Sequence, residues 1–205
     1  MATYRPKILL NSNNKYLAYY LDGGTYTPVF YRSGLIVKIM DAIAKQLTVV
    51  QSRHSRILVG LLQFNLSKGR GTVCNTLMSQ FIDKYIPKVK KHYKALGYST
   101  SVGYVWVREQ AGSTAQHYHA AFFVNQQCCA GIYKLWDLAV SIWHDLCGGH
   151  VIHPNNATLI VKRDNVESRH IALTRLSYYA KKETKKAGIY INNYSVSRMK
   201  AKKSS

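Results

Sequence analysis

The segment "VGYVWVREQAGSTAQHYHAAFFV", residues 102–124, contains two apolar runs separated by residues typical of turns. This pattern predicts a β-hairpin with strands at residues 102–109 and 117–124. Because side chains alternate between the two faces of a strand, His117 and His119 point to the same side, about 7 Å apart. Two imidazoles in this position either satisfy each other and the backbone, or converge on one metal ion.

Apolar residues on both sides of the hairpin recur with the spacing of helices and strands. Helices are expected at residues 35–47, 77–96, 132–146 and 168–188, and strands at residues 56–66 and 157–163. In the last helix, Ser168 is the expected N-cap and Gly188 the expected stop. From residue 56 onward, the order of elements is therefore β-α-β-β-α-β-α.

This order predicts an α+β fold with a ferredoxin-like, split β-α-β core and an antiparallel sheet. A C-terminal helix and an N-terminal extension with short strands at most would complete it. We expect one domain over residues 1–205, divided into an extension with a helix (1–55), a core (56–187) and a frayed basic tail (188–205). Helices on one face would leave the other sheet face open. Bases could stack there on aromatic residues such as Tyr104, Trp106, Tyr118 and Phe122.

The charge of the chain favours a polyanionic partner. The sequence has 29 Lys and Arg against 9 Asp and Glu, a net charge of +20 over 205 residues. No apolar run approaches the roughly 20 residues that span a bilayer, and "MATYRPKILLNSNN" (residues 1–14) is too polar for a signal peptide. The four cysteines show no disulfide pattern. We therefore expect a cytoplasmic protein that binds nucleic acid and no membrane.

Glu109 is the candidate third ligand beside the two histidines. It ends the first strand of the hairpin, directly before the turn-rich residues. If residue 109 pairs with residue 117 or 119, the carboxylate shares the histidine face; a register shifted by one puts Gln110 there instead. A carboxylate with two imidazoles suits a divalent ion such as Mg²⁺ or Mn²⁺.

A tyrosine pair occurs in the basic stretch "RLSYYAKKETKK", residues 175–186. In a helix, Tyr178 and Lys181 share one face, so a phenol lies beside an ammonium group. The apolar side of this helix contains Ala172, Leu173, Leu176 and Ala180, with Tyr179 at its margin. A phenol with its ordinary pKa of about 10 is a poor nucleophile, but a neighbouring cation and a metal-polarised phosphate favour its attack.

The two motifs together resemble those of the HUH (His-hydrophobe-His) endonucleases, which nick single-stranded DNA. More narrowly, "VWVREQ…HYHAAFFVN" and "RLSYYAKKETK" resemble segments of the replication initiation proteins of filamentous phages (inoviruses) and related integrated elements. The resemblance covers residues 56–187 in element order. It implies metal binding by His117, His119 and Glu109, and catalysis by Tyr178 with Lys181. Tyr179 remains the alternative nucleophile.

The resemblance also implies a reaction and its partners. The tyrosine would form a 5′-phosphotyrosine link and release a 3′-OH that primes rolling-circle replication from single-stranded DNA or a hairpin at an origin. Tyr178 and Tyr179 differ by about 100° around a helix, which indicates one nucleophile rather than an alternating pair. No phosphate-binding loop motif is present, so a separate helicase and polymerase are expected. A single-strand transposase and a non-catalytic binding module are the alternatives.

Overall fold

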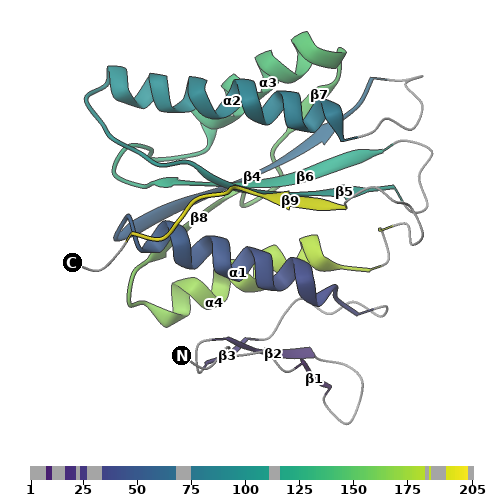
Figure 1. The fold of residues 1–205 in the computed structure, drawn as a ribbon, viewed down its shortest axis with the longest axis vertical. Coiled ribbons are helices and arrows are strands. Elements are labelled where there is room, and N and C mark those ends of the chain that lie inside the picture. Colours follow the sequence, from purple (N-terminus) through teal and green to yellow (C-terminus); the bar gives the residue numbers. More distant parts are fainter. Residues whose placement is uncertain are drawn as a thin grey trace.

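The computed structural model describes residues 8–10, 17–21, 24–26, 34–67, 75–110, 116–182, 185 and 193–202. They form an α+β fold, as predicted, with four helices and a six-stranded antiparallel sheet (Figure 1). The strands of this sheet are β4 (Arg56–Asn65), β5 (Gly103–Glu109), β6 (His117–Asn125), β7 (His150–Ile152), β8 (Thr158–Lys162) and β9 (Tyr194–Val196).

The sheet has the strand order β7-β4-β6-β5-β9, and β8 also pairs with β4, beside β7. The two central strands, β4 and β6, are rich in apolar residues, and most of their residues are buried. Strand β7 is not expected from the sequence, because three residues are too few to show a period. β4, β5, β6 and β8 reproduce the predicted split β-α-β arrangement, which puts β6, the second strand of the hairpin, between β4 and β5.

Helices cover both faces of the sheet, so the prediction of an open face is wrong. The helices are α1 (Val37–Gln51), α2 (Thr76–Ala95), α3 (Tyr133–Cys147) and α4 (Val166–Leu176). In Figure 1, α2 and α3 lie on one side of the sheet and α1 and α4 on the other. The reason is that β4 is apolar on both faces and α1 has an apolar stripe of its own to bury.

α1 packs closely against Gly103, the first residue of β5. A Cβ atom at this position would lie 2.7 Å from Cγ2 of Val50 in α1, so glycine permits the approach. Tyr118 and Phe122, expected on an open face, are instead buried under α2 and α3. Their rings contact Trp143 and Phe81, with centroid distances of 6.1 and 6.4 Å. Neither ring is therefore available to stack on a base.

The last predicted helix is shorter than expected and begins differently. Its N-cap is Asn165, whose side chain accepts a hydrogen bond from the Ser168 backbone N–H. After Leu176, the chain forms one 3₁₀ turn, η1 (Ser177–Ala180), and leaves the helical conformation at Lys181. Pairing with residues 34–36 explains this end: the Ile36 N–H donates to the Ala180 carbonyl. The expected stop at Gly188 lies outside the described residues.

The two ends of the chain also form strands. In the expected extension, the backbone of β1 (Ile8–Leu10), β2 (Leu17–Leu21) and β3 (Gly24–Tyr26) forms a separate three-stranded antiparallel sheet. The expectation of a frayed tail is wrong for β9, which pairs with β5 at the edge of the main sheet. Within the described part of the chain, no helix is both long and apolar enough to cross a membrane.

Candidate metal centre and tyrosine pair

The hairpin register brings Glu109 onto the same face as the two histidines. Glu109 pairs directly with His117, which selects the first of the two registers left open by the sequence. The Glu109 Oε2 atom lies 3.5 Å from His117 Nε2 and 3.3 Å from His119 Nε2. One ligand atom from each of the three residues lies within 4.8 Å of the other two. Two nitrogen donors and one oxygen donor thus converge on one point.

The chemistry of these donors fits a divalent metal ion. His119 Nε2 is buried and makes no hydrogen bond of acceptable geometry with the described residues, although the Glu109 carboxylate is near. A buried imidazole nitrogen without a hydrogen bond is costly, and coordination of a cation would satisfy it. Burial lowers the pKa of His119, which favours the neutral form that binds metals. Glu109, His117 and His119 together can therefore hold a metal ion.

Two lysines complete the surroundings of Glu109. Lys185 Nζ lies 3.1 Å from Glu109 Oε1, and Lys181 Nζ lies 3.5 Å from Oε2. Burial raises the pKa of Glu109, but the imidazoles of His117 and His119 and the charge of Lys185 outweigh burial and hold this pKa well below its ordinary range. The carboxylate is therefore charged in the folded protein. No sequence pattern indicates that Lys185 reaches Glu109, because the two residues lie 76 positions apart.

Glu109→Gln is expected to lower the free energy of unfolding of the metal-free protein by about 3 kcal/mol. The reason is that the Lys185 ammonium, which is only 2% exposed, loses its carboxylate partner. Urea denaturation in the presence of a chelator measures the change. Glu167→Gln, at an exposed acid in the first turn of α4, is the matched control and should cost less than about 1 kcal/mol. Equal stability of the Glu109→Gln variant and the parent would contradict the buried ion pair.

The tyrosine pair lies directly beside the metal cluster. The Tyr178 and Tyr179 rings lie 5.3 and 5.7 Å from the His119 ring, measured between centroids. Lys181 Nζ lies 3.7 Å from the Tyr178 ring centroid. In a continuous α-helix packed on its apolar side, Tyr178 would point away from the histidines. The 3₁₀ turn rotates each residue by about 120° rather than 100°, and Tyr178 here contacts His119.

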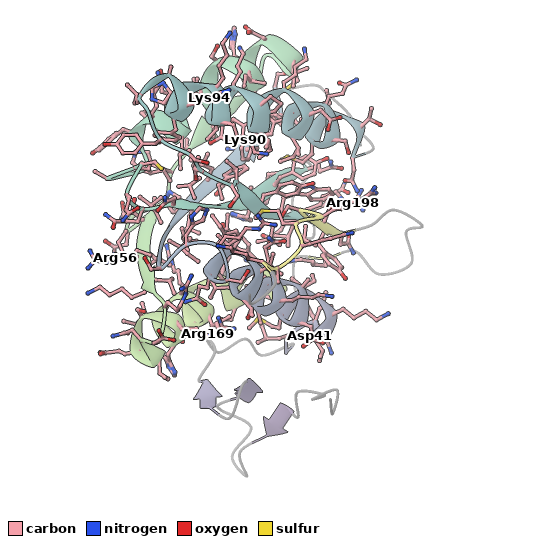
Figure 2. All side chains as sticks on the ribbon, turned by 60° about the vertical axis from the view of Figure 1, so that its left-hand side comes forward. Asp41, Arg56, Lys90, Lys94, Arg169 and Arg198 are labelled. Carbon is pink, nitrogen blue, oxygen red and sulfur yellow. The ribbon has the colours of Figure 1, made fainter. Side chains whose placement is uncertain are left out.

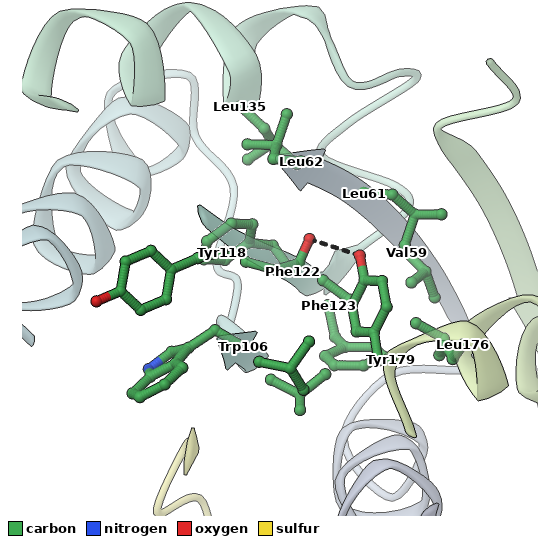
Figure 3. Close-up of a cluster of buried hydrophobic side chains, with 14 of the residues drawn as sticks. Val59, Leu61, Leu62, Trp106, Tyr118, Phe122, Phe123, Leu135, Leu176 and Tyr179 are labelled. Atoms are coloured by element: carbon green, nitrogen blue, oxygen red, sulfur yellow. Dashed lines mark hydrogen bonds between the residues drawn. The ribbon is translucent and has the colours of Figure 1, made fainter. Parts of the chain in front are cut away.

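The two tyrosines differ in their surroundings. The Tyr179 hydroxyl donates a hydrogen bond of 3.0 Å to the Ala120 carbonyl inside the buried cluster of the core (Figure 3). Burial raises the pKa of Tyr179 well above its ordinary range. Both tyrosines, with His119 and Arg175, line a small cavity of about 150 Å³, and Tyr178 is half-buried whereas Tyr179 is buried. Tyr178 is therefore the more exposed of the two, whereas the Tyr179 hydroxyl is held in the core by its hydrogen bond.

Comparisons with known proteins give one match. The sequence profile of the YagK/YfjJ C-terminal domain matches residues 25–197, which is most of the chain. No curated protein and no solved structure matches the chain.

Proposed function

The chain belongs to the YagK/YfjJ C-terminal domain family, and from this premise and the geometry above we propose that it is a metal-dependent endonuclease that nicks and rejoins single-stranded DNA. The observation that carries the proposal is the contact of Tyr178 with both His119 and Lys181. It joins a candidate nucleophile to a candidate metal site. The resemblance of both motifs to those of HUH endonucleases supports the same chemistry.

Glu109, His117 and His119 would hold the divalent ion, Mg²⁺ or Mn²⁺. When bound, such an ion polarises a phosphate oxygen and makes the phosphorus more electrophilic. The Tyr178 hydroxyl loses its proton to solvent, and its oxygen attacks the phosphorus of the scissile phosphodiester. The bond from phosphorus to the 3′ oxygen breaks, and this oxygen takes up a proton to become a 3′-OH. The product is a 5′-phosphotyrosine, which a later attack by a 3′-OH reverses.

Lys181 supports this step by its position. Its ammonium group lies against the Tyr178 ring and within 3.5 Å of Glu109 Oε2. A cation at this place stabilises negative charge on the phenolic oxygen as the proton leaves. Lys181 is about one-tenth exposed, so water screens this effect only weakly. Tyr178 would therefore be the nucleophile and Lys181 its electrostatic partner.

The biological role that we propose is initiation of rolling-circle replication of a phage, plasmid or integrated element. The resemblance to filamentous phage initiators supports this role, with a helicase and a polymerase as separate partners. A test uses single-stranded DNA labelled at either end and incubated with Mn²⁺. On a denaturing gel, 3′-labelled DNA should migrate with the protein and the 5′-labelled fragment should run free. The reverse pattern, or no cleavage, would contradict the proposal.

DNA affinity is expected to fall steeply with salt concentration. With a net charge of +20, phosphate contacts should dominate binding. Four such contacts to a single strand give roughly a fiftyfold loss of affinity between about 50 and about 200 mM salt. Fluorescence anisotropy of a labelled oligonucleotide, with a chelator present, measures this slope without cleavage. A flat dependence on salt would argue against binding through phosphates.

A further inference from the structure

A groove lies between α2 and the edge of the sheet, on the face opposite the metal cluster. Its volume is about 580 Å³, within the range of sites that hold small organic groups. Strand β5 contributes side chains to both faces of the sheet, because successive residues of a strand point to opposite sides. Glu109 points to the side of the histidines. Tyr104 and Trp106 lie five and three positions before it and therefore point to the groove. Residues from β9 and the chain after it form the outer side, notably Val196 and Arg198.

The lining suits a flat aromatic group. Tyr104 is half-buried, and Trp106 lies beneath the groove with its ring 5.7 Å from the Tyr118 ring. Figure 3 shows Trp106 and Tyr118 at one side of the buried cluster, away from Tyr179. Across the groove, α2 contributes the side chains of Ile86 and Pro87. A nucleobase placed between these walls would contact the Tyr104 ring on one side and aliphatic carbon on the other.

The charges around the groove suit a polyanion. Arg198 is exposed beside β9, and the α2 residues that line the groove include Asp83 and Ile86. Because residues three and four apart share a helix face, this stripe continues to the exposed Lys90 and Lys94. Figure 2 shows both lysines on α2 and Arg198 on the chain that follows β9. Asp83, the single acid among the described lining residues, can accept a hydrogen bond from the amino group of a base.

We infer that this groove is a binding site for single-stranded DNA, with a base stacked on Tyr104 and phosphates against Arg198 and Lys90. The inference rests on the proposed function only for the choice of DNA as the ligand. From Tyr104 to Glu109, β5 advances roughly 17 Å. A strand held in the groove would therefore pass the short edge strand β9 to reach the metal cluster, and the groove would hold DNA during nicking and joining.

The contribution of the aromatic ring is tested by the affinity of the full-length chain for an oligothymidine strand, in a chelator and at fixed salt. Tyr104→Ala should weaken binding roughly fivefold to a hundredfold, because it removes one stacked base. Tyr104→Phe, which keeps the ring, should bind like the parent. Duplex DNA should show no such difference between the variants. If Tyr104→Ala binds the single strand as tightly as the parent, the groove is not the site.

The contribution of charge is tested with two double variants that each remove two positive charges. Arg198→Ala/Lys90→Ala should reduce the slope of log affinity against log salt by about 1.4. Lys38→Ala/Lys45→Ala, at exposed positions of α1 on the other side of the sheet, should leave the slope unchanged. Equal slopes for the two pairs would overturn the inference. Because these assays need neither metal nor cleavage, their outcome is independent of whether the chain nicks DNA.

Discussion

Tyr178→Phe is expected to abolish the covalent protein–DNA adduct and to leave metal binding and DNA binding unchanged. The substitution removes the attacking oxygen and keeps the ring that packs against His119 and beneath Lys181. The adduct is measured on a denaturing gel with single-stranded DNA and Mn²⁺. Isothermal titration with Mn²⁺ shows whether the metal site survives. Adduct formation by Tyr178→Phe at the rate of the parent would exclude Tyr178 as the nucleophile.

Tyr179→Phe is the matched control, because it removes the same atom from the neighbouring position. The Tyr179 hydroxyl is bound to the Ala120 carbonyl, so its loss should cost about 1 kcal/mol of stability. Adduct formation should persist at a temperature where this variant is folded. The opposite pair of results, an active Tyr178→Phe and an inactive Tyr179→Phe, would transfer the role to Tyr179.

Replacing both His117 and His119 with Ala should lower nicking at least about a hundredfold, because the loss of metal costs several kcal/mol of transition-state stabilisation. Binding of Mn²⁺, measured by calorimetry without DNA, should disappear as well. Salt-dependent binding of single-stranded DNA should remain, since phosphate contacts by lysines and arginines are unchanged. Calorimetry separates loss of the metal from a direct effect on catalysis.

His92→Ala/His144→Ala removes two histidines of α2 and α3, on the face of the sheet opposite the candidate metal cluster, and is the control for this experiment. It should bind Mn²⁺ and nick DNA like the parent. Unchanged Mn²⁺ binding in the His117→Ala/His119→Ala variant would refute the metal site. Equal losses in both double variants would show that the histidine substitutions act through stability instead.

The histidine face could be predicted because it depends only on local geometry. Alternation along a strand requires His117 and His119 to share a side, whatever the rest of the fold. The position of Glu109 required the register of the hairpin, and the sequence allowed two registers because the connecting residues fix no single loop length. Lys185 could not be predicted as a partner of Glu109, since that contact depends on the helical conformation ending at Lys181.

The end of the last helix could not be predicted from periodicity, because it depends on contacts between distant parts of the chain. The basic residues after Ala180 fit a helix by composition, and nothing local stops one there. The structure stops it because residues 180–182 pair with residues 34–36, a contact between distant parts of the chain. The covering of the second sheet face has a similar origin. The apolar side of α1 was evident in the sequence. The sequence did not show that this side would pack on the second face of the sheet.

The most direct test of the proposed chemistry is the mass of the protein after incubation with a single-stranded origin oligonucleotide and Mn²⁺. Nicking through a phosphotyrosine predicts a new species heavier by the mass of the 3′ fragment of the DNA, absent when a chelator replaces the metal. Proteolysis and fragmentation of this species should place the nucleotide on Tyr178 within "LSYYAK" (residues 176–181). Cleaved DNA without any change in protein mass, or a nucleotide on a residue other than Tyr178, would contradict the proposal.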